Sequence, residues 1–185
     1  MKRILFALIG FGALAGAVTI ASPVSGQSSG EEAAPIYGIK LYQGYRDWRL
    51  ISVKQLTGAG GKFKQLRAQL GNDIAVEAFR TGKLPFPDGA VIAALHWNEA
   101  SSDADNKVLA DGFPNVGLES VFAGPAVNVQ FMVKDSKKYA ATGGWGFADF
   151  TNGKPGNEAL HQQCFGCHLP AKDHDFVFTH YAPTP

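Results

Sequence analysis

"AVNVQFMV" at residues 126–133 and "WGFADF" at residues 145–150 decide the fold class, because both are short runs rich in β-branched and aromatic residues. The segment between them, "KDSKKYAATGG" at residues 134–144, is charged and contains glycine, which is typical of a turn. Another strand is predicted at residues 118–124, ahead of Pro125. This part of the chain therefore predicts consecutive strands with short connections.

Helices are predicted on both sides of these strands. Apolar residues recur at helical spacing over residues 60–83, where Gly71-Asn72 either interrupts the helix or splits it in two. A second helix is predicted at residues 155–168. Further strands are predicted at residues 45–53, 90–97 and 173–183, and a long surface loop at residues 98–117. We therefore expect an α+β fold, a mainly antiparallel β-sheet with flanking helices, the last of them near the C-terminus.

The N-terminus has the layout of a secretory signal peptide. Lys2 and Arg3 precede an apolar run over residues 4–21, and small residues follow it. A single transmembrane anchor is the alternative, because the apolar run approaches spanning length. We expect a signal peptide at residues 1–26, a flexible leader at residues 27–36 and one folded domain at residues 37–185. Export would place this domain in the periplasm.

The charge of the expected mature chain is nearly balanced. Without the first 26 residues, 15 basic residues face 16 acidic ones. This balance leaves no excess of basic residues for binding nucleic acid or an anionic membrane surface, so we expect no nucleic-acid partner. Export also implies an oxidising compartment, where an unoccupied pair of thiols tends to form a disulfide. The two cysteines of the chain therefore need an explanation.

Both cysteines lie in "CFGCH" at residues 164–168, which matches the attachment motif of c-type haem. Cys164 and Cys167 can form thioethers to the two vinyl groups of one porphyrin, and His168 then lies under the iron as its axial ligand. A disulfide would leave His168 without a role. A zinc ion would need more ligands, such as His161 and His174, at unfamiliar spacing. The motif favours one covalently attached haem c, with a disulfide and zinc as the alternatives.

The motif lies late in the chain, with 17 residues after His168. In ordinary electron-transfer cytochromes c a downstream methionine supplies the sixth ligand, whereas Met132 lies upstream and is better explained as a core residue. The other candidates for a sixth ligand are His96, His161, His174 and His180, and a surface or hydrogen-bonded role is favoured for each. We therefore expect a five-coordinate iron whose open side binds small ligands. Some of the 13 phenylalanines are expected to line the open side of the iron. Such an apolar lining weakens O₂ binding, which needs a hydrogen-bond donor, more than NO or CO binding.

Several stretches of the chain resemble the cytochrome P460 family, which includes the cytochromes c′-beta. They are "YRDWRLISV" at residues 45–53, "LPFPDGAVIAALHW" at residues 84–97, residues 121–150, "CFGCH", and "DFVFTHYAP" at residues 175–183. The resemblance implies a mostly antiparallel β fold with flanking helices, usually as a homodimer. It also implies one c-type haem, with His168 as the proximal ligand and Cys164 and Cys167 as the thioether anchors.

The family that the chain resembles has two kinds of member. Cytochrome P460 enzymes oxidise hydroxylamine on a haem that is cross-linked to a lysine, whereas the c′-beta members bind gases such as NO and CO. The resemblance places this lysine in the strand Ala90 to Trp97, which contains no lysine and has Ala94 at the matching position. Glu99 and Glu119 are candidates for a distal carboxylate that moves a proton, although a surface role is favoured for both.

The leading hypothesis is a periplasmic monohaem c-type cytochrome that binds NO, CO or a related nitrogenous ligand, for sensing, scavenging or detoxification. The absent lysine disfavours the first alternative, a hydroxylamine oxidoreductase that passes electrons to a soluble redox partner. The second alternative is an electron-transfer cytochrome c. A homodimer is expected in each case.

Overall fold

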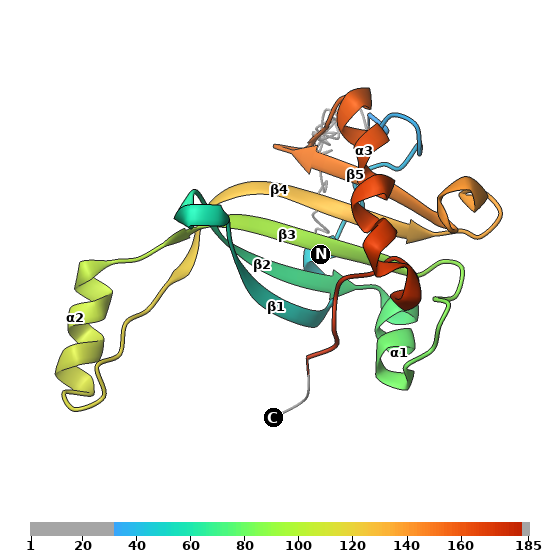
Figure 1. Cartoon of the computed structure of the whole chain (residues 1–185). Coiled ribbons are helices and arrows are strands. Elements are labelled where there is room, and N and C mark those ends of the chain that lie inside the picture. The colour runs from blue at the N-terminus through green and yellow to red at the C-terminus, as the bar shows by residue number, and fades with distance from the viewer. Residues whose placement is uncertain (1–31, 183–185) are drawn as a thin grey trace, which may run out of the picture. The chain divides into compact units, whose positions relative to one another are not determined.

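The computed structural model describes residues 32–182, so the predicted signal peptide and the first part of the predicted leader lie outside the described residues. Within residues 32–182 the chain forms a six-stranded antiparallel sheet, in which the strands follow chain order, and three α-helices (Figure 1). The predicted fold class is confirmed. No helix in this part of the chain is long and apolar enough to cross a membrane.

The strands are β1 Arg49–Thr57, β2 Lys64–Gly71, β3 Val91–Ala100, β4 Phe122–Lys134, β5 Trp145–Thr151 and β6 Lys154–Pro155. The α-helices are α1 Asp73–Thr81, α2 Asp103–Gly112 and α3 Glu158–His168. Short 3₁₀ helices lie at Tyr45–Asp47, Ala59–Gly61, Ala140–Thr142 and Leu169–His174. The strands predicted at residues 90–97 and 145–150 and the helix predicted at residues 155–168 are confirmed, and the strand predicted at residues 45–53 is confirmed from Arg49 onward.

The helix predicted over residues 60–83 is wrong in its first half, which forms β2 between β1 and β3. Leu66 and Leu70 are four residues apart, a spacing that puts them on one side of a strand as well as of a helix. The alternation of polar and apolar residues in "QLRAQL" fits the strand. The helical prediction holds from Asp73 onward.

Asn72 makes the transition from β2 to α1. Its side-chain oxygen accepts the amide hydrogen of Ala75, which caps α1, and also that of Val91 at the start of β3, both at 3.0 Å. Its side-chain nitrogen donates to the Gly89 carbonyl at 2.8 Å. One side chain thus begins the helix and holds the turn that leads into β3.

Two further predictions differ from the structure between β3 and β5. The predicted surface loop at residues 98–117 contains α2, which is capped by the Ser102 hydroxyl. The two strands predicted around Gly124-Pro125 are one strand, β4. Trp97 and Glu99 pair with Ala126 and Ala123, so Gly124 and Pro125 lie in a bulge, where a proline removes no ladder hydrogen bond.

The strand predicted at residues 173–183 does not form. The chain leaves a 3₁₀ helix at His174 and reverses through Asp175 and Phe176, which have φ of +52° and +63°. Beyond this reversal the Ala182 amide donates to the Ile51 carbonyl at 2.8 Å. The alternation in this segment reflects packing on the sheet and on α3, not membership of the sheet.

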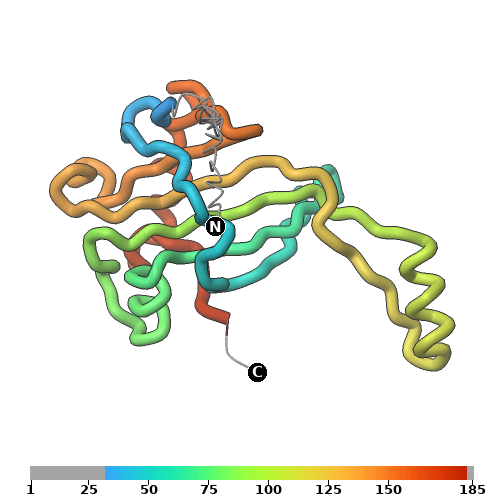
Figure 2. Tube along the Cα trace, turned by 180° about the vertical axis from the view of Figure 1, so that it is seen from behind, coloured from blue at the N-terminus to red at the C-terminus, as the bar shows by residue number. Residues whose placement is uncertain are grey.

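The two faces of the sheet are covered differently. On one face the segment before β1 crosses the sheet (Figure 2). Phe131 of β4 packs against this segment, with ring centroids 5.3 Å from Tyr42 and 5.4 Å from Tyr45. The other face carries α3 (Figure 1). Because side chains alternate along a strand, Ala94 and His96 of β3 lie on the α3 face.

The chain between β3 and β4 forms an arm, residues 101–121, that carries α2 away from the sheet (Figure 1). Large apolar side chains are exposed on the arm and at its junction with β4. They are Val108, Phe113, Val116, Leu118, Val121 and Phe122. Clusters of exposed apolar side chains are typical of interaction surfaces.

Candidate functional site

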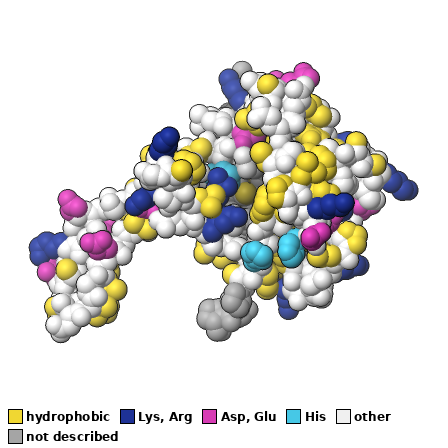
Figure 3. Space-filling view, viewed as in Figure 1, with side chains coloured by type: hydrophobic (Ala, Val, Ile, Leu, Met, Phe, Trp, Pro, Cys, Tyr) yellow, Lys and Arg dark blue, Asp and Glu magenta, His cyan; other side chains and the backbone are white. Residues whose placement is uncertain are grey.

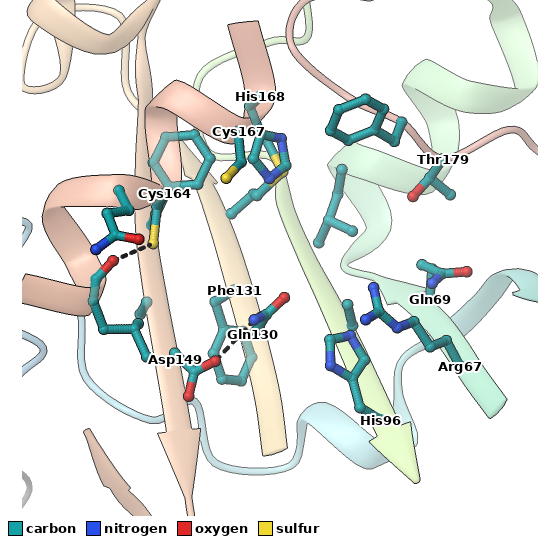
Figure 4. Close-up of a pocket in the computed structure, with 18 of the residues that line it drawn as sticks. Arg67, Gln69, His96, Gln130, Phe131, Asp149, Cys164, Cys167, His168 and Thr179 are labelled. Atoms are coloured by element: carbon teal, nitrogen blue, oxygen red, sulfur yellow. Dashed lines mark hydrogen bonds between the residues drawn. The ribbon is translucent and has the colours of Figure 1, made fainter. Parts of the chain in front are cut away.

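The face of the sheet under α3 contains a cavity of about 330 Å³, which is in the range of small-molecule sites. Cys164, Cys167 and His168 line it from α3, and side chains of the sheet line it from the opposite side (Figure 4). In the space-filling view this face is hollowed, with basic and histidine side chains beside apolar surface (Figure 3). The structure therefore brings the three residues predicted to bind haem to one cavity.

His161 holds α3 on the sheet. Its ring is fully buried, and Nδ1 donates to the Asn157 carbonyl at 2.8 Å. This fixes Nε2 as an acceptor, which takes the Asp149 amide hydrogen at 3.1 Å. The Asn157 side chain caps the same helix through the Leu160 amide at 2.9 Å. His161 is thus a structural residue, and both of its ring nitrogens are used.

His168 ends α3 with one ring nitrogen bound and the other free to coordinate. Nδ1 lies 2.7 Å from the Phe176 carbonyl oxygen and must donate to it, which leaves the lone pair on Nε2. The ring packs against Phe147 and Phe178, with centroids 4.9 Å and 5.1 Å away. Burial lowers the pKa of His168, so the imidazole is neutral at pH 7. A neutral imidazole whose other nitrogen donates to a carbonyl is the usual form of a histidine ligand.

The cysteines are free thiols, one helical turn apart at the same cavity. The Cys164 thiol donates to the Leu160 carbonyl at 3.6 Å. Burial, with a further contribution from Asp149, raises the pKa of Cys164 to about 11. A disulfide is not formed. Among residues 32–182 no group of three or more His, Cys, Asp or Glu residues could hold a metal ion, so the geometry offers the zinc alternative no ligand set.

The register of the sheet sets the wall opposite α3. Ala94 at the centre of this wall pairs with Gln69 of β2 and Gln130 of β4. Two residues further along β3, on the same face, His96 pairs with Arg67. Ala94, His96 and these three partners all line the cavity. The wall therefore has a small residue, Ala94, between the polar side chains of its neighbouring strands. Figure 4 shows the side chains of Arg67, Gln69, His96 and Gln130 at the cavity.

Polar atoms on this wall lack partners. Nε of Arg67, Oε1 of Gln69 and Nε2 of His96 are buried without a hydrogen bond. Burial lowers the pKa of Arg67, and burial together with the Arg67 charge lowers the pKa of His96 to about 4. Unsatisfied buried polar groups in a folded protein are rare and call for a missing partner. Their position in the cavity indicates a bound group with polar atoms.

The acidic candidates from the sequence do not reach this cavity. Glu99 accepts a hydrogen bond from Gln55 and pairs with Lys64 at the end of β3, and Glu119 is exposed near the arm's end. The carboxylate that lines the cavity is Asp149, which sequence reasoning missed. Its signal was the alternation in "WGFADF", which puts Asp149 on the same face as Phe147.

The candidates for a sixth ligand are divided between the cavity and other places. Met132 and His96 line the cavity, so Met132 is not simply a core residue. His161 does not line it. His174 and His180 have ring centroids 6.3 Å apart and line a separate cavity of about 170 Å³.

Two phenylalanines that line the cavity, Phe147 of β5 and Phe178, contact the ring of His168. The ring of Phe131 instead packs on the opposite face of the sheet, against Tyr42 and Tyr45. The sheet wall combines polar side chains with the apolar residues Ile92, Ala94 and Met132, and the sequence did not indicate its polar part. One lysine, Lys54 of β1, lines the cavity beside Arg67, and burial followed by the Arg67 charge lowers its pKa.

These residues fit a c-type haem. The cavity holds two free thiols with the spacing of the two attachment sites, a histidine whose free nitrogen can bind iron, and unsatisfied polar atoms across from them. A family model described as cytochrome P460 matches residues 42–179, which is most of the chain. No curated protein matches the chain.

Proposed function

The chain belongs to the cytochrome P460 family, and we propose that it binds one haem c in the cavity between α3 and the sheet. Cys164 and Cys167 would hold the haem through two thioethers, and Nε2 of His168 would bind the iron. When bound, the haem supplies an iron that exchanges small ligands and electrons. The Phe176 carbonyl would then orient the imidazole, and side chains of the sheet wall would surround a small ligand bound to the iron.

We propose that this open position binds a small nitrogen oxide or a related gas. The observation that carries the proposal is the His168 geometry, in which the bond to the Phe176 carbonyl leaves one nitrogen for iron, opposite a wall centred on Ala94. The unpaired Nε–H of Arg67 favours ligands that accept hydrogen bonds, such as bound NO, over CO. Sensing, scavenging and detoxification all use such a site.

The absorption spectrum of the haem-loaded protein tests this proposal. A broad, unshifted, high-spin Soret band that responds to NO is the expected result. A low-spin, six-coordinate spectrum in both oxidation states would overturn it. In that case His96 or Met132, which both line the cavity, would be the sixth ligand, and electron transfer would be the better function.

Hydroxylamine oxidation is a second candidate, favoured by two side chains of the cavity. Lys54 lines the cavity from β1, although β3 has Ala94 where the resemblance places the lysine, and Asp149 is a buried carboxylate at the same cavity. A Soret band far to the red, together with hydroxylamine turnover using an artificial acceptor, would support this candidate. Loss of both in Lys54→Gln but not in Lys64→Gln would identify Lys54, because Lys64 lies on β2 outside the cavity.

We propose the cellular location from the N-terminal sequence and the homodimer from the exposed apolar side chains of the arm. A signal peptide would deliver the protein to the periplasm, where a soluble redox partner would exchange electrons with the haem.

A homodimer would cover the exposed apolar side chains of the arm. Light scattering of the haem-loaded protein should give twice the chain mass. The mass of a single chain for Phe113→Ser at the arm, with an unchanged haem spectrum, would assign the arm to the interface.

A further inference from the structure

A buried ion pair outside the cavity involves Asp175, which directly precedes the residue whose carbonyl binds His168. Nζ of Lys134 is 2.8 Å from both carboxylate oxygens of Asp175, and the two side chains are 5% and 8% exposed. Nζ also donates to the Gly143 carbonyl at 3.1 Å and lies 5.0 Å from the Trp145 ring centroid. Replacing such a pair with apolar residues is often neutral for stability, so its presence suggests another role.

Asp175 holds a backbone reversal in place. Asp175 and Phe176 both have left-handed φ, which is uncommon for residues other than glycine and persists where the surroundings enforce it. Besides Lys134, the Asp175 carboxylate accepts the Phe86 amide hydrogen at 2.8 Å. A Cβ at Gly143 would overlap the Phe176 ring, because the ring packs directly against the Gly143 backbone. This packing also fixes the position of Phe176.

This reversal delivers the carbonyl that binds His168. Phe176 follows Asp175 directly, and its oxygen accepts from Nδ1 of His168 at 2.7 Å. We propose that Lys134 and Asp175 are positioning residues, which hold the Phe176 carbonyl at this distance and so set the orientation and basicity of the axial imidazole. The inference rests on the proposed haem ligation by His168. A donated Nδ1 hydrogen makes the imidazole a stronger ligand and favours ferric iron.

The test is a double variant, Lys134→Met with Asp175→Asn. It removes both charges together, so no unpaired buried charge remains, and the asparagine oxygen can still accept the Phe86 amide hydrogen. Resonance Raman spectroscopy of the ferrous protein measures the iron–histidine stretch, and redox titration measures the midpoint potential. We expect a lower and broader stretching band and a higher potential than in the wild type. The control is Lys107→Met with Asp111→Asn, an exposed pair on α2, which should change neither.

Each outcome decides the inference. A folded, haem-loaded double variant with the wild-type band and potential would overturn it and leave the pair a purely structural feature. If the double variant does not fold, Asp175→Glu takes its place, because it keeps both charges and displaces the carboxylate by one methylene; an unchanged band and potential in that variant overturn the inference equally. A wild-type protein without covalent haem, or with no iron–histidine band, would instead defeat the proposed function.

Discussion

Replacing Arg67 with methionine should weaken the binding of an anionic ligand to ferric iron and leave CO binding to ferrous iron nearly unchanged. Arg67 lines the cavity on the sheet side, its Nη2 donates to Gln65 at 3.2 Å, and its Nε is buried without a partner. Methionine keeps the length and the apolar contacts of the side chain and removes the donors and the charge. The variant therefore isolates the polar contribution.

The size of the effect follows from the kind of bond lost. A hydrogen bond to a charged group contributes about 1.5–3 kcal/mol, which corresponds to roughly 10- to 150-fold in affinity. CO accepts hydrogen bonds weakly and has no charge, so its affinity should change by less than about threefold. Fluoride is the probe of choice for ferric iron, because it is small, anionic and a strong acceptor.

The assay is an optical titration of wild-type and variant protein with fluoride in the ferric state and with CO in the ferrous state. Lys64→Met is the matched control, since Lys64 is a cation on the same strand that pairs with Glu99 and does not line the cavity. Equal fluoride affinities of Arg67→Met and wild type would refute the reasoning. A parallel loss of CO affinity would refute it as well, because that would indicate a collapsed cavity.

Three other changes test separate parts of the site. Cys164→Ala or Cys167→Ala alone should leave the haem attached by one thioether, and the double variant should release it on denaturation, as mass spectrometry of the unfolded chain would detect. His161→Ala should lower the free energy of unfolding by roughly 3–5 kcal/mol in urea titrations, because it leaves a void and removes the partner of the buried Asp149 amide. His96, with its pKa lowered to about 4, takes up its proton more readily in the unfolded state, so stability should fall as the pH drops from about 6.5 to 4; His96→Gln should flatten this dependence. A wild-type stability that stays constant over that range would contradict the buried, neutral state of His96.

Local sequence signals predicted the strands that carry a clear pattern of their own. β5 and α3 were predicted within a few residues, because "WGFADF" alternates and Asn157 is a strong helix cap. β2 was mistaken for a helix, because Leu66 and Leu70 fit both periods and Gln, Arg and Ala favour helices. Pairing with β1 and β3 overrides that propensity, and no single-sequence pattern shows that pairing.

The site shows the same contrast between local motifs and long-range pairing. The half contributed by α3 is a contiguous motif, so the sequence predicted Cys164, Cys167 and His168 directly, and the structure brings them to one cavity. The half contributed by the sheet comes from separate strands, and Arg67 lies in the segment that was predicted as a helix. Glu99 was proposed for its position near the end of a strand, but its side chain pairs with Lys64 outside the cavity.

The ligand chemistry of the cavity therefore depends on strand register more than on any local motif. A slip of one residue in β2 would turn Arg67 away from the cavity and bring Ala68 into it, because neighbouring residues of a strand point to opposite faces. Asn72 opposes such a slip, since it binds the Val91 amide and the Gly89 carbonyl directly beside the last pair of β2 and β3. A residue with no contact to the cavity thus helps decide which side chains face the proposed haem. The sheet wall can therefore change while the attachment motif stays the same, and such a change would alter which ligand the proposed haem binds.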